Sequence, residues 1–197
     1  MDNRRVTHDR QSNRLPHYDY SQPGAYYVTL VTYERACLFG EIREGEVWLS
    51  AIGQIADRAW REIPEHFAGV TEDDYVIMPN HVHGIIWIEG PDLEVTGEME
   101  LEREVGARHA SPLRGNGGSN PRGVKPHSLG AIVGSFKSAV TKQIHKIRGY
   151  EHLRVWQRNY YEHVIRDEKA YEEIVCYITA NPSNWELDRE YPSSQYS

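Results

Sequence analysis

The sequence predicts one α+β domain with the β-α-β-β-α-β order of a ferredoxin-like sandwich, an antiparallel sheet and an appended C-terminal helix. Three observations predict it. Runs rich in β-branched and aromatic residues alternate with segments of helical spacing in this order. Two of these runs are joined by a tight Pro-Asn turn, and a further helical segment follows the last run. The 197 residues are 39% hydrophobic, which is enough for one domain with a proper core.

The first strand is predicted at residues 24–33, GAYYVTLVTY, because this run is rich in β-branched and aromatic residues. A short return strand is expected at Val47–Leu49. Ser50 is a suitable N-cap for a helix over 51–67, where apolar residues recur at helical spacing. Pro64 is expected to close or kink the end of that helix.

The second half of the pattern starts with residues 74–89, DYVIMPNHVHGIIWIE, which are predicted to form an antiparallel hairpin. Residues 91–126 lack a period and are rich in Gly, Pro, Ser and charge, so a long mobile insertion is expected there. Helical spacing returns over 128–147. An extended segment is predicted at 155–166, and a last helix over 167–181, stopped by Asn-Pro.

The predicted domain covers residues 14–185, with residues 1–13 and 186–197 as loose tails. No apolar run approaches the ~20 residues of a membrane span, and the N-terminal stretch has no apolar core of a secretory signal. Two cysteines without a CxxC pattern fit a reducing compartment. We therefore expect a cytoplasmic, nucleoid-associated protein with no membrane partner.

The charge is unevenly distributed. The net charge of -7 and pI of about 5.8 argue by themselves against nucleic-acid binding. However, residues 105–148 contain no Asp or Glu but eight Lys and Arg, directly after the acidic stretch 89–104. This asymmetry is compatible with one basic face on an acidic protein, and equally with a solvated loop that happens to lack acids.

Two histidines stand in the predicted hairpin, in the stretch VIMPNHVHGII. Side chains two residues apart in a strand project from the same face, so His81 and His83 are neighbours. Val82, Ile86 and Ile88 then point to the opposite face, toward the core. Paired imidazoles on a rigid strand can share one divalent cation. The alternative is a pair of surface histidines on the open face of an antiparallel sheet.

Tyr177 and Asn181 lie four residues apart on the last predicted helix, so their side chains share a face at the edge of its buried stripe. A phenol and an amide placed there can look onto the sheet. The alternative is an ordinary edge tyrosine followed by an asparagine that ends the helix before proline.

The combination of VIMPNHVHGII with the distant CYITANPSNW resembles the single-tyrosine HUH transposases. It is most similar to the REP-associated tyrosine transposases and their insertion-sequence relatives. The stretches RLPHYDYSQPGAYYVTLVTYER, LGAIVGSFKSAVTKQI and VWQRNYYEHVIRDEKAYEEIVCYI agree with this resemblance, which spans about 14–185.

The resemblance implies a ferredoxin-like fold and a role for each motif. His81 and His83 would bind Mg²⁺ or Mn²⁺, Tyr177 would be the nucleophile, and Asn181 would occupy the third ligand position. The activity implied is metal-dependent cleavage and strand transfer of single-stranded, hairpin-bearing DNA through a covalent 5′-phosphotyrosine. Some members of this family are homodimers that exchange the tyrosine helix, and others act as monomers.

Four basic residues are candidates for holding the DNA: Lys137, Lys142, Arg148 and Arg158. For Lys137, an ordinary exposed helix lysine is an equal alternative. Tyr160 and Tyr161 are rival nucleophiles, or rings that pack or stack on a base.

Two other functions remain open on the sequence alone. A metallohydrolase could use the histidine pair without a covalent tyrosine, but it would need further ligands such as Asp or Glu within reach. A non-catalytic nucleic-acid-binding module is the third possibility, although such modules present aromatic side chains on the sheet rather than two histidines. Metal-dependent cleavage and a trapped covalent adduct separate the three.

Overall fold

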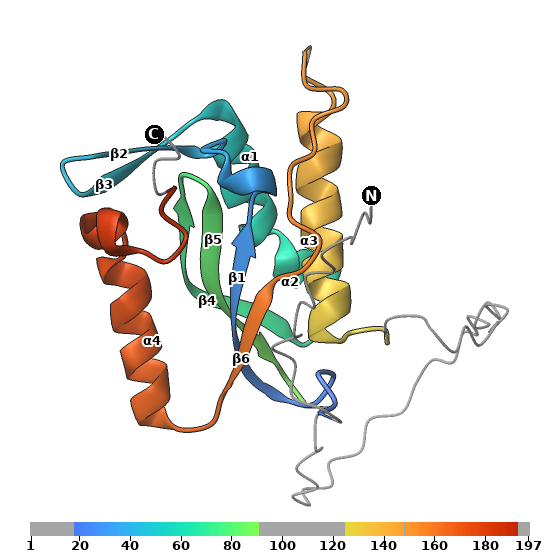
Figure 1. Cartoon of the computed structure of the whole chain (residues 1–197). Coiled ribbons are helices and arrows are strands. Elements are labelled where there is room, and N and C mark those ends of the chain that lie inside the picture. Colours follow the sequence, from blue (N-terminus) through green and yellow to red (C-terminus); the bar gives the residue numbers. More distant parts are fainter. Residues whose placement is uncertain (1–17, 91–124, 148, 193–197) are drawn as a thin grey trace, which may run out of the picture.

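The computed structural model describes residues 18–90, 125–147 and 149–192 (Figure 1). A four-stranded antiparallel sheet forms its centre, with strand order β4-β5-β1-β6. Two helices cover one face of the sheet and a third covers the other. The strands of this sheet are β1 (Gly24–Val31), β4 (Val70–Met78), β5 (His81–Ile88) and β6 (Tyr161–Ile165), and the three helices are α1 (Ala51–Arg61), α3 (Leu129–Ile144) and α4 (Glu168–Ala180).

The predicted ferredoxin-like fold is confirmed. In chain order the four sheet strands are β1, β4, β5 and β6, and in the sheet they run second, third, first and fourth. Helix α1 connects the first to the second strand, and α3 connects the third to the fourth. Both helices lie on the same face, where they pack against each other. Helix α4 is the appended C-terminal helix that the sequence predicts.

The predicted helix over 51–67 is in fact two pieces. Ser50 caps α1, with its side-chain oxygen accepting a hydrogen bond from Gly53 N at 3.0 Å. Helix α1 ends at Arg61, and a short helix α2 (Ile63–His66) starts after it with Pro64 in its first turn. The proline has no N–H to donate to the preceding turn, so it begins a helix rather than continuing one.

A second, two-stranded sheet stands where the sequence predicted only one short return strand. It consists of β2 (Gly40–Arg43) and β3 (Glu46–Leu49), joined by a turn in which Gly45 has a φ of 80°. Predicted strand 74–78 is also longer, because β4 begins at Val70 and passes through an irregularity between Glu72 and Tyr75. The sequences of β2 and of the first residues of β4 show no clear alternation of apolar and polar residues, so the sequence did not predict them as strands.

The two faces of the sheet have separate apolar clusters. The larger lies under α1 and α3, and Val82, Ile86 and Ile88 of β5 belong to it as predicted. The smaller lies under α4 and is built on Ala25, Tyr27, Ile85 and Ile178. Among the residues of α4 only Ile178 is fully buried. Tyr171, Ile174 and Val175 of α4 are only partly buried but pack against the same cluster, so an apolar stripe holds this helix over the sheet.

Two of the predicted regions fall largely or wholly outside the described residues: the N-terminal tail 1–13 and the insertion 91–126, of which only 125 and 126 are described. The other predicted tail, 186–197, is described as far as 192, and it contains Asp188, which is buried. None of the described helices combines the length and the apolar character needed to cross a membrane.

Candidate active site

His81 and His83 occupy the first and third positions of β5, on the sheet face under α4. Their ring centroids are 4.3 Å apart, and their exposed fractions are 0% and 3%. The sequence prediction that they share a face is confirmed. The alternative of two surface histidines on an open sheet is wrong, because α4 and the segment that follows it cover this face.

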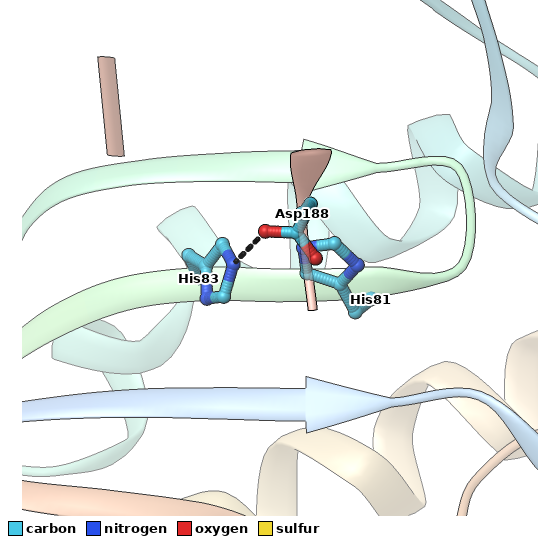
Figure 2. A group of neighbouring side chains, drawn as sticks. All are labelled: His81, His83 and Asp188. Carbon is cyan, nitrogen blue, oxygen red and sulfur yellow. Dashed lines mark ion pairs between the residues drawn. The ribbon is translucent and has the colours of Figure 1, made fainter. Parts of the chain in front are cut away.

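Asp188 joins the two histidines from a distant part of the chain (Figure 2). After α4, the short helix η2 (Pro182–Leu187) turns the chain back over β5. The Asp188 carboxylate then lies 4.0 Å from His81 Nε2 and 3.6 Å from His83 Nε2. One possible ligand atom from each of the three residues lies within 4.8 Å of the others. Sequence analysis missed Asp188, since no periodic pattern links it to β5.

Tyr177 and Asn181 converge on the same carboxylate. Tyr177 Oη donates to Asp188 Oδ2 at 2.6 Å and lies 3.3 Å from His83 Nε2. Asn181 Nδ2 donates to the same Asp188 oxygen at 2.7 Å. Asn181 is buried, whereas Tyr177 is 43% exposed. The two residues thus share a helix face, as predicted. This face lies over the histidines, and the phenol is on its solvent-exposed side.

The electrostatics of this cluster favour a neutral tyrosine beside a charged carboxylate. Burial, together with the hydrogen bond to Asp188, raises the pKa of Tyr177 well above its ordinary value. Burial opposes ionisation of Asp188, but the nearby His83 and the hydrogen bonds from Tyr177 and Asn181 outweigh it and lower the pKa of the carboxyl. Burial and the neighbouring His83 lower the pKa of His81 to about 3, so His81 is neutral at pH 7.

These residues fit a divalent metal ion. Two imidazoles and a carboxylate are a common ligand set for first-row metals and for mixed N/O sites. Among the described residues, His81 Nε2 and Asn181 Oδ1 are buried polar atoms without a hydrogen-bond partner. Such atoms are costly to leave unpaired, and coordination to a cation is one way to satisfy them. The cluster His81, His83 and Asp188 could therefore hold a divalent metal, with Asn181 beside it.

Other buried side chains contact the Nδ1 atoms of both imidazoles, which point away from Asp188. His83 Nδ1 lies 2.7 Å from Tyr27 Oη and 3.0 Å from Thr29 Oγ1, both on the neighbouring strand β1. His81 Nδ1 lies 2.8 Å from Asn80 Oδ1 in the turn between β4 and β5. Partners at this position fix the orientation of a metal-binding imidazole.

A groove of about 1120 Å³ runs from His83 and Tyr177 across the sheet edge at β6 toward α3. Its lining is mixed in charge but contains four cationic side chains and four tyrosines, namely Arg35, Lys137, Arg158, Arg189, Tyr27, Tyr160, Tyr161 and Tyr177. The hydroxyl of Tyr177 contacts both His83 Nε2 and Asp188, whereas that of Tyr27 contacts His83 at Nδ1. The rival nucleophiles Tyr160 and Tyr161 line the groove beside Tyr177.

The predicted DNA-binding residues are separated by the structure. Lys137 and Arg158 line the groove, whereas Lys142 lies with Lys146 on a shallower hollow on the outer side of α3. Arg148 lies outside the described residues. Lys137 is not an ordinary exposed lysine, because its Nζ donates to Gln157 O at 2.9 Å and burial lowers its pKa to about 8.

The same fold occurs in a solved transposase. The structure of a REP-associated tyrosine transposase bound to a REP hairpin matches with a TM-score of 0.54 and 17% sequence identity, over 89% of this chain and 76% of that chain. This chain therefore has the fold of a REP-associated tyrosine transposase, in agreement with the resemblance carried by its motifs. A candidate transposase from Deinococcus radiodurans gives a lower TM-score of 0.44 at 14% identity, over 84% of this chain and 94% of that chain.

A protein of Haemophilus influenzae, uncharacterized in function, is 39% identical over 184 residues, which cover 93% of this chain and 94% of that protein. The chain belongs to the same family as this protein. No protein-family model matches the chain.

Proposed function

We propose that this protein is a single-tyrosine HUH transposase, which cleaves and rejoins single-stranded, hairpin-bearing DNA through a covalent 5′-phosphotyrosine. The observation that carries the proposal is the position of Tyr177. Its hydroxyl lies 3.3 Å from His83 Nε2 and 2.6 Å from the Asp188 carboxylate, in a cluster that fits a divalent metal. A half-exposed phenol at such a cluster is suited to attack a phosphodiester.

In the proposed step, Tyr177 Oη forms a bond to the scissile phosphorus and the P–O3′ bond breaks. The products are a 5′-phosphotyrosine and a free 3′-hydroxyl, and attack by a 3′-hydroxyl on the phosphotyrosine reverses the step without an external energy source. The phenol already donates to Asp188, so this carboxylate is placed to receive its proton and, because the pKa of the carboxyl is low, to pass it to solvent. The departing O3′ takes up a proton from solvent to become the 3′-hydroxyl. His81, His83, Asp188 and Asn181 would hold Mg²⁺ or Mn²⁺, which neutralises charge on the phosphate.

The groove supports single-stranded DNA as the substrate class. Cations and tyrosine rings line it from the sheet edge to Tyr177, and single-strand binding commonly combines a cationic track with aromatic stacking. Lys137 and Arg158 are the groove residues that we propose for contact with DNA, in spite of the net charge of -7. The hairpin requirement rests on the resemblance in sequence and fold.

A metallohydrolase without a covalent tyrosine is the second candidate, and Asp188 is the observation that favours it. The sequence supplied no carboxylate near the histidines, but the structure brings one between them. With a carboxylate ligand in place, a metal-bound water could act as the nucleophile.

The deciding experiment is incubation of the protein with labelled single-stranded hairpin DNA and Mn²⁺, followed by a denaturing gel. We expect a metal-dependent covalent protein–DNA band that is lost in Tyr177→Phe and kept in Tyr161→Phe, a matched loss of a groove hydroxyl. Cleavage without an adduct that survives Tyr177→Phe would establish the metallohydrolase. Absence of cleavage with any hairpin tested would contradict both candidates and favour a binding module.

A further inference from the structure

Asn80 is a completely buried side chain at the turn before the histidine strand, and every polar group of its amide is paired. Its Nδ2 donates to two backbone carbonyls, Arg35 O at 3.1 Å and Glu190 O at 2.8 Å. Its Oδ1 lies 2.8 Å from His81 Nδ1. Asn80 therefore links the loop after β1, the start of β5 and the C-terminal segment.

The two carbonyls determine which way the Asn80 amide points. Carbonyl oxygens only accept hydrogen bonds, so the amide nitrogen must face Arg35 O and Glu190 O, and the amide oxygen is left for His81. This oxygen can only accept, so His81 Nδ1 must carry the proton. A neutral imidazole has one N–H, and His81 Nε2 is then a bare lone pair directed into the cluster, where it has no donor among the described residues.

The same amide also positions the aspartate. Asn80 holds Glu190 by its carbonyl, and Glu190 N donates to Asp188 Oδ1 at 2.6 Å. The carboxylate thus reaches the histidines on a segment that is tied down two residues later. One asparagine in this way acts on two of the three residues in the cluster, His81 directly and Asp188 through the backbone of Glu190.

We infer that Asn80 is a positioning residue, which sets the tautomer of His81 and anchors the segment carrying Asp188, so that a lone pair and a carboxylate face one another. The expected effect of Asn80 on metal affinity rests on the proposed function, whereas its effect on the tautomer of His81 does not. Removal of the amide frees His81 Nδ1. The ring can then move its proton to Nε2, where it faces the Asp188 carboxylate at 4.0 Å instead of a cation.

The test is ¹⁵N NMR of histidine-labelled, metal-free protein at neutral pH, together with Mn²⁺ titration. We expect wild-type His81 in the Nδ1–H form and Asn80→Ala with a substantial Nε2–H population. Asn80→Asp keeps an acceptor for Nδ1–H but cannot donate to Glu190 O, so it should keep the wild-type tautomer. Mn²⁺ affinity should fall roughly 10–100-fold in Asn80→Ala, as for other partners of metal-binding histidines. Asn184→Ala, which removes an exposed amide that donates to Ala180 O, is the matched control.

An Nε2–H tautomer in the wild type, or an unchanged Nδ1–H tautomer in folded Asn80→Ala, would overturn the inference. If Asn80→Ala does not fold, the wild-type and Asn80→Asp spectra still decide the tautomer. A wild-type protein that shows the expected tautomer but binds no Mn²⁺ would overturn the proposed function and leave the role of Asn80 in the tautomer standing.

Discussion

Tyr177 and Asp188 are joined by a hydrogen bond of 2.6 Å, in which the phenol of α4 donates to a carboxylate from the segment after η2. The contact brings together a candidate nucleophile and a candidate metal ligand that are eleven residues apart and on different elements. In this state the phenol is held neutral, because the nearby negative charge adds to the effect of burial on its pKa. The carboxylate thus adds to the effect of burial on the protonation of the phenol and accepts its hydrogen bond.

Asp188→Asn tests this effect. The amide keeps the size of the side chain but removes its charge, so the pKa of Tyr177 should fall toward the ordinary value of ~10. The measurement is an alkaline titration of ¹³Cζ-tyrosine-labelled protein by NMR. Tyr26, on the opposite sheet face, is the internal control, because burial and Tyr18 rather than Asp188 raise its pKa. A Tyr177 resonance that titrates alike in both proteins would show that burial alone sets its pKa.

The stability of the metal-free protein should depend on pH through His81. Its pKa is lowered to about 3 in the folded protein, against 6.5 for an ordinary histidine. The unfolded chain therefore binds the additional proton between these values, and the contribution of His81 is present above pH 6.5 and lost as the pH falls. At ~1.4 kcal/mol per pH unit, the free energy of unfolding should drop by about 2 kcal/mol from pH 6.5 to pH 5.

Urea unfolding with EDTA at several pH values measures this dependence. In His81→Asn the slope between pH 5 and 6.5 should become shallower than in wild type. His66→Asn, a substitution at an exposed histidine of α2, should leave the slope unchanged. Parallel pH profiles for wild type and His81→Asn would contradict the assignment of a buried, neutral His81.

Gly84 follows His83 in β5 and faces the other side of the sheet, toward α1. A Cβ atom at Gly84 would stand 2.3 Å from the ring of Trp60, so no residue larger than glycine fits there unless the ring moves. Gly84→Ala must displace a fully buried tryptophan of α1, so we expect a loss of about 1–3 kcal/mol in stability. Gly134→Ala on α3 has nothing within 4 Å and should stabilise the helix by roughly 0.5–1 kcal/mol. Thermal unfolding of the two variants gives the comparison, and equal melting temperatures would contradict it.

The sequence predicts the histidine strand and the tyrosine helix well, because each of these pairs lies on a single element with a fixed period. His81 and His83 share a face by strand alternation, and Tyr177 and Asn181 by helical spacing. The order of elements was also enough to predict the sheet topology, since a β-α-β-β-α-β chain has few ways to bury its apolar faces.

Asp188 and Asn80 could not be predicted in the same way. Asp188 lies in a polar stretch without period, and its burial depends on the path of the chain after η2, which is a tertiary property. The sequence places Asn80 only in the Pro-Asn turn that joins two predicted strands. Its contacts with Arg35 and Glu190 join residues 45 and 110 positions away in the chain, and no local pattern encodes such contacts. Lys137 and Lys142 are different, because five residues on one helix correspond to a rotation of ~140° about its axis, so the two side chains face different hollows.

This separation of the two lysine sites leads to the last prediction, which concerns DNA binding. Arg158 is exposed and lines the groove that ends at Tyr177, while Lys142 lies on the outer side of α3. If single-stranded DNA follows the groove, Arg158→Ala removes one phosphate contact. Binding should weaken, and the slope of log K against log salt concentration should become shallower by ~0.7. Lys142→Ala should change the slope less, because its hollow does not lead to the tyrosine.

Fluorescence anisotropy with a labelled single-stranded hairpin, measured over a range of salt concentrations, gives both slopes. The comparison uses Tyr177→Phe as background, so that covalent capture does not distort the equilibrium. A larger change in slope for Lys142→Ala than for Arg158→Ala would place the DNA on the outer side of α3. The proposed metal site and Tyr177 would then need a second strand segment to reach them, because the binding surface and the proposed nucleophile would lie on different sides of the sheet edge.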